Sequence, residues 1–178
     1  MQDALKVYDY ITESLGVAHE DIILFGRSLG SSPSCYIAKE RPQVGGLILM
    51  SPFKSLREVA RDRVGHLLSF LLAERFSNIE LIEKVRCPVL IIHGPKDRVI
   101  GIEHSIALKI RCGSSYCQLF TPDSMDHNTF HVQDDIIAPI KAFFRQVNIK
   151  THRTTDASAA FHLDSILYQI PVSIYGRD

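Results

Sequence analysis

Hydrophobic residues along the chain form two kinds of pattern: short continuous runs, and longer runs with helical spacing. Residues 3–15 place apolar side chains near helical intervals, which predicts an amphipathic helix that ends at Gly16. The runs at 21–26, 46–52 and 87–94 are short and almost continuously apolar, as expected for parallel strands covered on both faces. A fourth strand is predicted at 116–121.

Segments with helical character separate these predicted strands. Helices are expected at 29–39, where the Arg41-Pro42 pair ends the pattern, at 102–111 and at 134–147. The alternation of strands and helices indicates an α/β fold with a mainly parallel sheet and flanking helices. We therefore expect one domain over residues 1–150.

Two segments depart from this alternation. Residues 54–86 form a long insertion between strands, and its apolar stretch at 64–76 fits either a helical cap over a site or an ordinary packing helix. Residues 151–178 mix polar and apolar side chains without a sustained period, which predicts a C-terminal tail of low order.

Composition and charge narrow the functional classes. The chain is 46% hydrophobic, and 20 Lys and Arg balance 20 Asp and Glu, so the charge provides no electrostatic footprint for nucleic acid. The four cysteines form no CxxC pair, and no His/Cys cluster has metal-ligand spacing, so we expect structural cysteines and neither a metal nor another cofactor. The sequence lacks the pattern of a secretory signal or a membrane span, which favours a cytoplasmic setting.

The most informative motif is Gly26-Arg27-Ser28-Leu29-Gly30, a GxSxG sequence between a predicted strand and a predicted helix. In that context the motif forms a strained turn that exposes the serine hydroxyl, and glycines on both sides are expected to let backbone approach without a Cβ clash. Ser28 is therefore a candidate nucleophile, and the Leu29 backbone N–H is a candidate oxyanion donor. A Gly-Ser turn without activity is the alternative.

A serine nucleophile needs a base, and the base needs an acid to orient it. Asp97 lies in the loop after the predicted strand at 87–94, and His127 lies in the loop after the strand at 116–121. The order Ser, Asp, His is the one that this kind of sheet requires. Because the carboxyl ends of parallel strands meet at one edge, we expect Ser28, Asp97 and His127 to converge as a catalytic triad.

Other side chains near these positions have alternative interpretations. His93 stands at a strand end and is interpreted as a turn or packing residue. Asp126 adjoins His127 and is a second choice for the acid, while His131 replaces His127 only in a different loop register. Arg27 is interpreted as a packing or salt-bridge residue, with a substrate-facing role as the alternative.

Four segments carry a resemblance to the α/β-hydrolase-domain proteins, especially the branch named alpha/beta hydrolase domain-containing protein 17. They are DIILFGRSLGSSPS, LILMSPFKSL, FSNIELIEKVRCPVLIIHGPKDRVI and MDHNTF, within a similarity over about residues 3–147. The resemblance implies nucleophile, acid and base roles for Ser28, Asp97 and His127. It also implies thioester hydrolysis, because members of this branch remove palmitate from cysteines. GPKD and DHN depart slightly from the family's usual acid and base loops.

The resemblance also concerns what precedes the motif. Proteins with this fold have several strands before the elbow strand, and a loop there donates the second oxyanion N–H. We therefore expect the chain to form the C-terminal part of an α/β-hydrolase fold, with its first strands missing and the strand at 21–25 at a sheet edge. The family's lipidated N-terminal segment, through which peripheral membrane association would occur, is not found in this sequence.

Three functional classes remain open at this stage. The leading one is an ester or thioester hydrolase that forms an acyl-Ser28 intermediate on an acylated protein or a small acyl ester. The second is a weak or inactive hydrolase-fold module for binding or scaffolding. The third is a serine peptidase, because the same triad also cleaves amides.

Overall fold

A computed structural model describes residues 1–64 and 76–149 of the chain. Its sheet has four parallel strands in the spatial order β1-β2-β3-β4: β1 (Ile23–Arg27), β2 (Gly46–Met50), β3 (Val89–Ile92) and β4 (Cys117–Phe120). The prediction of a parallel sheet with the first strand at an edge is confirmed. Each strand is shorter than its predicted apolar run, and β1 also extends one residue past its run, to Arg27.

Helical segments connect the strands. The first is α1 (Gln2–Asp9), which continues as the π-helical turn η1 (Tyr10–Ser14). The others are η2 (His19–Asp21), η3 (Ser28–Gly30), α2 (Ser31–Glu40), α3 (Leu56–Val64), α5 (Asn78–Ile82), α6 (Ile102–Arg111), η4 (Val132–Ile137) and α7 (Ala138–Gln146). The helices predicted at 3–15, 29–39, 102–111 and 134–147 are thus confirmed, with the last one beginning as η4.

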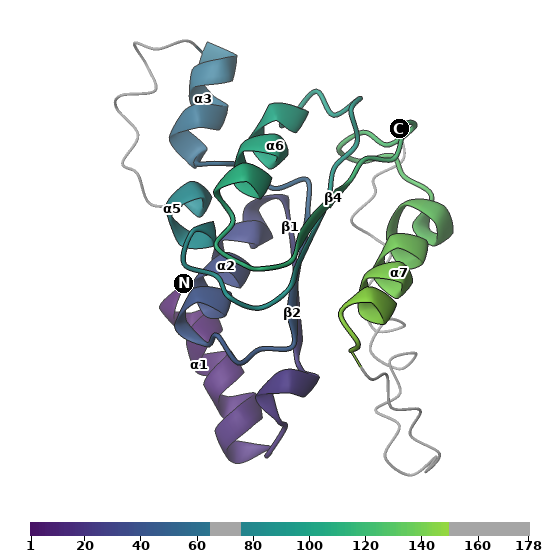
Figure 1. Ribbon diagram of the computed structural model, residues 1–178. Helices are drawn as coiled ribbons and strands as arrows, with labels where there is room; N and C mark the ends of the chain where they lie inside the picture. Colours follow the sequence, from purple (N-terminus) through teal and green to yellow (C-terminus); the bar gives the residue numbers. More distant parts are fainter. Residues whose placement is uncertain (65–75, 150–178) are drawn as a thin grey trace, which may run out of the picture.

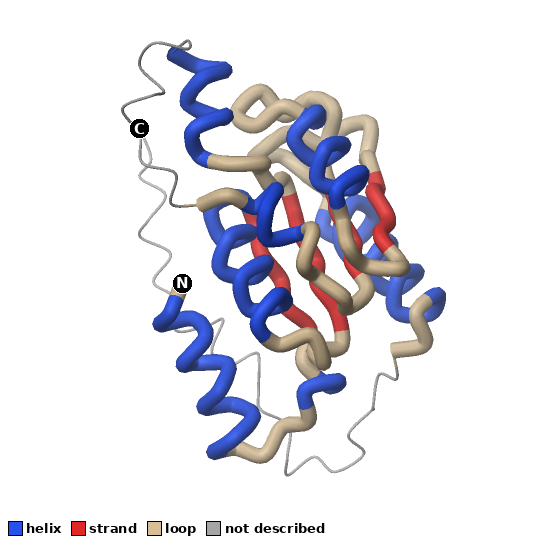
Figure 2. Tube along the Cα trace, turned by 60° about the vertical axis from the view of Figure 1, so that its left-hand side comes forward, coloured by secondary structure: helices blue, strands red, loops and turns tan. Residues whose placement is uncertain are grey.

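The described elements form three layers (Figure 1). One cluster of buried side chains joins α1, α2, α5 and α6 to the sheet through Leu24, Leu47, Leu49, Val89 and Ile91. A second cluster joins α7 to the opposite face through Ile48, Met50, Leu90, Ile92 and Phe143. Figure 2 views the sheet through the first layer, with the helices in front of the strands. Alternate residues of β2 and β3 therefore enter different cores, which explains their continuously apolar sequences.

One expectation about β1 is wrong. Its run was expected to be covered on both faces, but Phe25 is 48% exposed and Arg27 is also exposed, while Leu24 and Gly26 are buried. The reason is that β1 is an edge strand: among the described residues, α1 and α2 cover one of its faces, whereas on the other face α7 packs mainly on the central strands and reaches β1 only at Ile23. The apolar run alone does not distinguish an edge strand from a central one.

The cysteines contribute to the first core as predicted. Cys35 and Cys87 are buried in it, and Cys112 and Cys117 pack against it. Burial raises the pKa of the Cys87 thiol to about 12 and also raises that of Cys35, so both thiols stay protonated and behave as small apolar groups.

The structure describes the insertion at 54–86 on both sides of its apolar stretch. In the insertion, α3 and α5 are described, and an antiparallel bridge joins Ser55, just before α3, to Ser77, just before α5. The apolar stretch expected as a cap falls almost entirely outside the described residues, as does the tail at 151–178. Within the described ranges, no helix has the length and apolar character needed to span a membrane.

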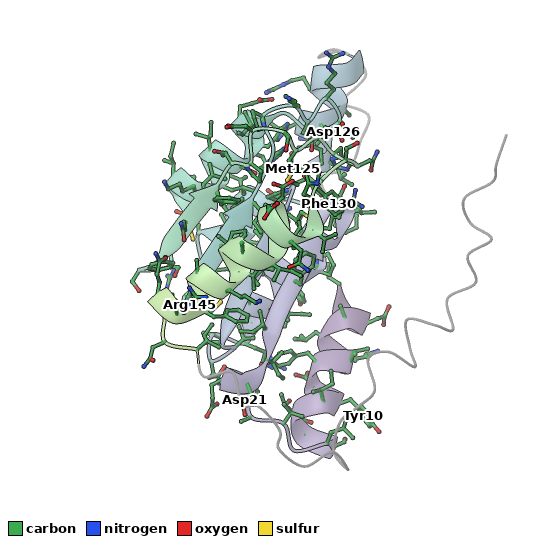
Figure 3. The ribbon with its side chains drawn as sticks, turned by 90° about the vertical axis from the view of Figure 1, so that its right-hand side faces the viewer. Tyr10, Asp21, Met125, Asp126, Phe130 and Arg145 are labelled. Carbon is green, nitrogen blue, oxygen red and sulfur yellow. The ribbon has the colours of Figure 1, made fainter. Side chains whose placement is uncertain are left out.

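The parallel arrangement gathers functional loops at one end of the sheet. The loops that follow β1, β3 and β4 all leave from strand carboxyl ends. Figure 3 shows Met125, Asp126 and Phe130 at the end of the molecule opposite Asp21 and Tyr10. Residues of the loops after β1, β3 and β4, which are far apart in the sequence, therefore lie near one another at this end.

Candidate active site

Ser28 occupies a strained turn between β1 and α2. Its φ of 49° lies in the left-handed region, which costs a residue with a Cβ about 1–2 kcal/mol. A Cβ at Gly26 would lie 2.6 Å from the Gly30 carbonyl oxygen and 2.9 Å from the Ser31 Cα, so position 26 requires glycine. The same steric requirement predicted for Gly30 is wrong: its φ is −64° and a Cβ there would meet open space.

The structure brings the three predicted side chains together. Ser28 Oγ lies 3.2 Å from His127 Nε2, and His127 Nδ1 lies 2.7 Å from Asp97 Oδ2. The carboxylate accepts from Nδ1–H, which leaves Nε2 as the acceptor for the serine hydroxyl. This is the tautomer in which an imidazole can remove a proton from Ser28.

Asp97 is buried and held by several donors. Oδ1 accepts the backbone N–H groups of Val99 at 2.8 Å and Ile100 at 2.9 Å. Burial alone would raise the pKa of this carboxyl, but hydrogen bonds from His93, Ile100, His127 and Val99 outweigh it and hold the pKa well below its usual range. Asp97 is therefore an anion that stays beside His127 across the physiological range.

His127 is held in a short loop after β4. Asp126 shapes this loop: its Oδ1 accepts the backbone N–H groups of Asn128 at 2.8 Å and Thr129 at 2.7 Å. These two hydrogen bonds lower the pKa of the Asp126 carboxyl. Asp97, not Asp126, contacts the His127 ring. His131 lies at the start of η4, where its backbone N–H donates to Asp135, so the loop register places His127 at Ser28.

Arg27 has a contact that the sequence did not predict. Its guanidinium donates to the His127 carbonyl oxygen at 2.6 Å and to Asn128 Oδ1 at 3.0 Å, and it lies 6.0 Å from the centre of the Phe130 ring. The residue before the candidate nucleophile thus ties β1 directly to the loop of the candidate base. No local signal indicates this contact, because its partners are about 100 residues away in the chain.

A series of hydrogen-bonded polar side chains supports the turn that contains Ser28. Ser31 Oγ donates to the Ser28 carbonyl oxygen at 2.6 Å, and Asn78 Nδ2 donates to Ser31 Oγ at 2.8 Å and to the Phe53 carbonyl oxygen at 2.9 Å. Asn78 and Ser31 are fully buried. They connect the second end of the insertion to the candidate nucleophile, and sequence reasoning missed both.

The candidate oxyanion donor lies in the turn that contains Ser28. Leu29 is in η3, which runs directly into α2, and the first N–H groups of a helical segment have no partner within it. An anion near this end is also stabilised by the helix dipole. The side chain of Leu29 is 56% exposed, so substrate can approach this part of the turn.

A cleft of about 690 Å³ opens beside His127 and Asp97. Its walls come from the loop after β3 that carries Asp97 (the acid loop) and the loop after β4 that carries His127 (the base loop). The lining residues are Pro95, Lys96, Asp97, Arg98, Val99, Asp126, His127 and Asn128. The cleft therefore borders the candidate acid and base, while Ser28 is not among its lining residues.

Comparison with known proteins identifies the fold family. The Caenorhabditis elegans alpha/beta hydrolase domain-containing protein aho-3 is 30% identical over 141 residues, which cover 79% of this chain and 41% of that protein. Human alpha/beta hydrolase domain-containing protein 17B is 34% identical over 131 residues, which cover 74% of this chain and 44% of that protein. The chain thus has relatives among the alpha/beta hydrolase domain-containing proteins, and its fold is the α/β-hydrolase fold.

Solved structures agree with this assignment. An α/β-hydrolase enzyme from a lagoon-sediment metagenome superposes with a TM-score of 0.61 at 20% identity, covering 81% of this chain and 69% of that one. The chain spans less than half the length of the two relatives above. No protein-family model matches it. The expected α/β-hydrolase fold is thus confirmed.

Proposed function

We propose that this α/β-hydrolase chain is a serine hydrolase that cleaves carboxylic esters or thioesters through an acyl-Ser28 intermediate. The observation that carries the proposal is the continuous pair of hydrogen bonds from Ser28 Oγ to His127 Nε2 and from His127 Nδ1 to Asp97 Oδ2. A nucleophile, a base in the correct tautomer and a buried anion that orients it are the minimum that acyl transfer requires.

Acylation follows from this geometry. Ser28 Oγ attacks the substrate carbonyl carbon while His127 Nε2 accepts the hydroxyl proton, and Asp97 stabilises the imidazolium that forms. The Leu29 N–H stabilises the negative carbonyl oxygen of the tetrahedral intermediate. When that intermediate collapses, Nε2–H protonates the departing alcohol or thiol, and the acyl group remains on Ser28.

Deacylation reuses the same groups. A water molecule replaces the leaving group beside His127, which removes its proton and directs the oxygen to the acyl carbon. The carboxylic acid is then released, and the proton returns from Nε2 to Ser28 Oγ. The cleft beside His127 allows the leaving group to depart and water to enter.

An acylated protein with a thioester bond is the proposed substrate. Relationship to the alpha/beta hydrolase domain-containing protein 17 branch supports this choice, as does the resemblance of the four segments described above. Exposed apolar side chains at Leu29, which follows Ser28, and at Val99, two residues after Asp97, provide apolar surface for an acyl group. Cleaving a thioester also demands less of the catalyst than cleaving an amide.

A fluorophosphonate probe tests the reaction class, because it forms a covalent bond only with an activated serine. We expect the wild-type chain to be labelled and Ser28→Ala to be unlabelled. Ser115→Ala is the matched control, since Ser115 is an exposed serine in the loop before β4, and its labelling should equal that of the wild type. A folded wild-type chain that resists labelling would instead favour a binding or scaffold module.

A second assay tests the substrate class. Matched fluorogenic substrates with the same acyl group in thioester, oxygen ester and amide linkage should be hydrolysed in that order of rate. Faster cleavage of the amide would contradict the proposed substrate and favour a peptidase.

A further inference from the structure

His93 is a second histidine in contact with the candidate acid. It follows β3, and its side chain is fully buried. Its Nδ1 lies 2.6 Å from Ser105 Oγ, and its Nε2 lies 2.9 Å from the Ile100 carbonyl oxygen and 3.3 Å from Asp97 Oδ2. Every polar atom of the ring thus has a partner, as expected for a buried polar group.

These partners define where the ring proton lies. A carbonyl oxygen only accepts hydrogen bonds, so Nε2 must carry a proton that points to Ile100. The same N–H faces Asp97 Oδ2 at the longer distance, so the proton is shared between the loop carbonyl and the carboxylate. Nδ1 is then free to accept the hydroxyl proton of Ser105.

Asp97 Oδ2 consequently lies between two imidazoles. His127 Nδ1 approaches at 2.7 Å and His93 Nε2 at 3.3 Å, while Oδ1 is occupied by two backbone N–H groups. His93 also closes the acid loop, because one nitrogen bonds Ile100 at the end of that loop and faces Asp97 in its middle.

We propose that His93 is a positioning residue of the candidate triad: it fixes the Asp97 carboxylate in the orientation that holds His127 toward Ser28. This inference rests on the proposed function. Among the described residues, the polar contacts of the His93 ring are with Ser105, Ile100 and the Asp97 carboxylate, and the last is the contact through which it acts. The packing histidine expected from the sequence therefore acquires a functional contact.

A matched pair of amide variants separates the two ring nitrogens. His93→Gln places an amide near the position of Nε2 and retains a donor to Asp97, whereas His93→Asn places it near Nδ1 and loses that donor. With a fluorogenic thioester, we expect kcat to fall about 10- to 100-fold in H93N with KM unchanged, as misplacement of a catalytic group predicts. H93Q should stay within about 5-fold of the wild type. Equal losses in the two variants, or wild-type kcat in H93N, would overturn the proposal.

A double-mutant cycle shows whether the effect passes through the acid. If it does, H93N should lower kcat much less in an Asp97→Asn background than in the wild type, because the group that it positions is already impaired. An undiminished loss would show that His93 acts independently of Asp97.

An NMR measurement that needs no substrate separates a failure of this inference from a failure of the proposed function. The His127 Nδ1–H proton gives a downfield NMR resonance when it is bonded to Asp97. We expect that resonance to shift or disappear in H93N and to persist in H93Q. If the wild type hydrolyses no substrate, the proposed function fails, and this resonance still tests His93. An unchanged resonance in folded H93N would reject the positioning role.

Discussion

The Arg27 guanidinium donates a hydrogen bond of 2.6 Å to the backbone carbonyl oxygen of His127. This contact joins the last residue of β1, which precedes Ser28, to the loop that carries His127. It adds to the packing of Met125 and Phe130 in the core beneath α7, and it reaches the loop from an edge strand whose other face is partly exposed.

Removing this link should impair catalysis more than stability. Arg27→Met keeps the apolar stem but deletes the donors, so His127 should lose its alignment and kcat/KM should fall on the order of 10-fold. The melting temperature should change little, since Arg27 is exposed. Arg27→Lys retains one donor and should lie between the two. A Met variant as active as the wild type would show that the contact has no catalytic consequence.

The two glycines of the motif should respond differently to alanine. Gly26→Ala places a methyl group against the Gly30 backbone, so we expect a loss of more than about 2 kcal/mol in unfolding free energy. Gly30→Ala has room and a helical φ, so the free energy should stay the same or rise by about 0.5 kcal/mol. Urea denaturation measures both. Similar losses of unfolding free energy in the two variants would contradict the steric difference between the two positions.

The strain at Ser28 predicts a difference between two inactive variants. Both Ser28→Ala and Ser28→Gly lack the nucleophile, but only alanine keeps a Cβ at a φ of 49°. Ser28→Gly should therefore be more stable than Ser28→Ala by about 1 kcal/mol in denaturant titrations. Greater stability of the alanine variant would show that the turn relaxes without cost.

The depressed pKa of Asp97 makes its stabilising effect depend on pH. A carboxyl whose folded pKa is lowered contributes stability above its unfolded pKa of about 3.9, and this contribution is lost as pH falls through the folded value. Asp97→Asn should therefore be less stable than the wild type at pH 7, on the order of 2 kcal/mol, with a smaller difference near pH 3. A stability difference that stays constant with pH would argue against a contribution from the Asp97 charge.

The Asp97→Asn substitution should also lower turnover. The neutral amide that Asp97→Asn introduces cannot stabilise the imidazolium and favours the wrong His127 tautomer, so turnover should fall about 10³- to 10⁴-fold at pH 7. Comparison of kcat for Asp97→Asn and Ser28→Ala shows whether residual activity remains, as expected if Asp97 orients the base without reacting. Full activity in the Asp97→Asn variant would remove Asp97 from the triad.

Apolar periodicity and motif spacing were enough to predict the four strands, the helices outside the insertion at 54–86, the parallel arrangement and the candidate site. Periodicity reports whether a segment is helix or strand, and the Gly26-to-Gly30 motif is a local steric device. Asp97 and His127 could be placed because strand ends in a parallel sheet share one edge, so chain order alone predicts convergence.

The contacts that hold this site emerge only in the folded chain. Exposure of Phe25 depends on which strand lies at the edge and where α7 packs, and the links from Arg27 to His127 and from Asn78 to Ser31 join segments 100 and 47 residues apart. The contact of His93 with Asp97 depends on the path of one loop. Local patterns do not encode such contacts, because side-chain partners across a fold are set by packing of whole layers against one another.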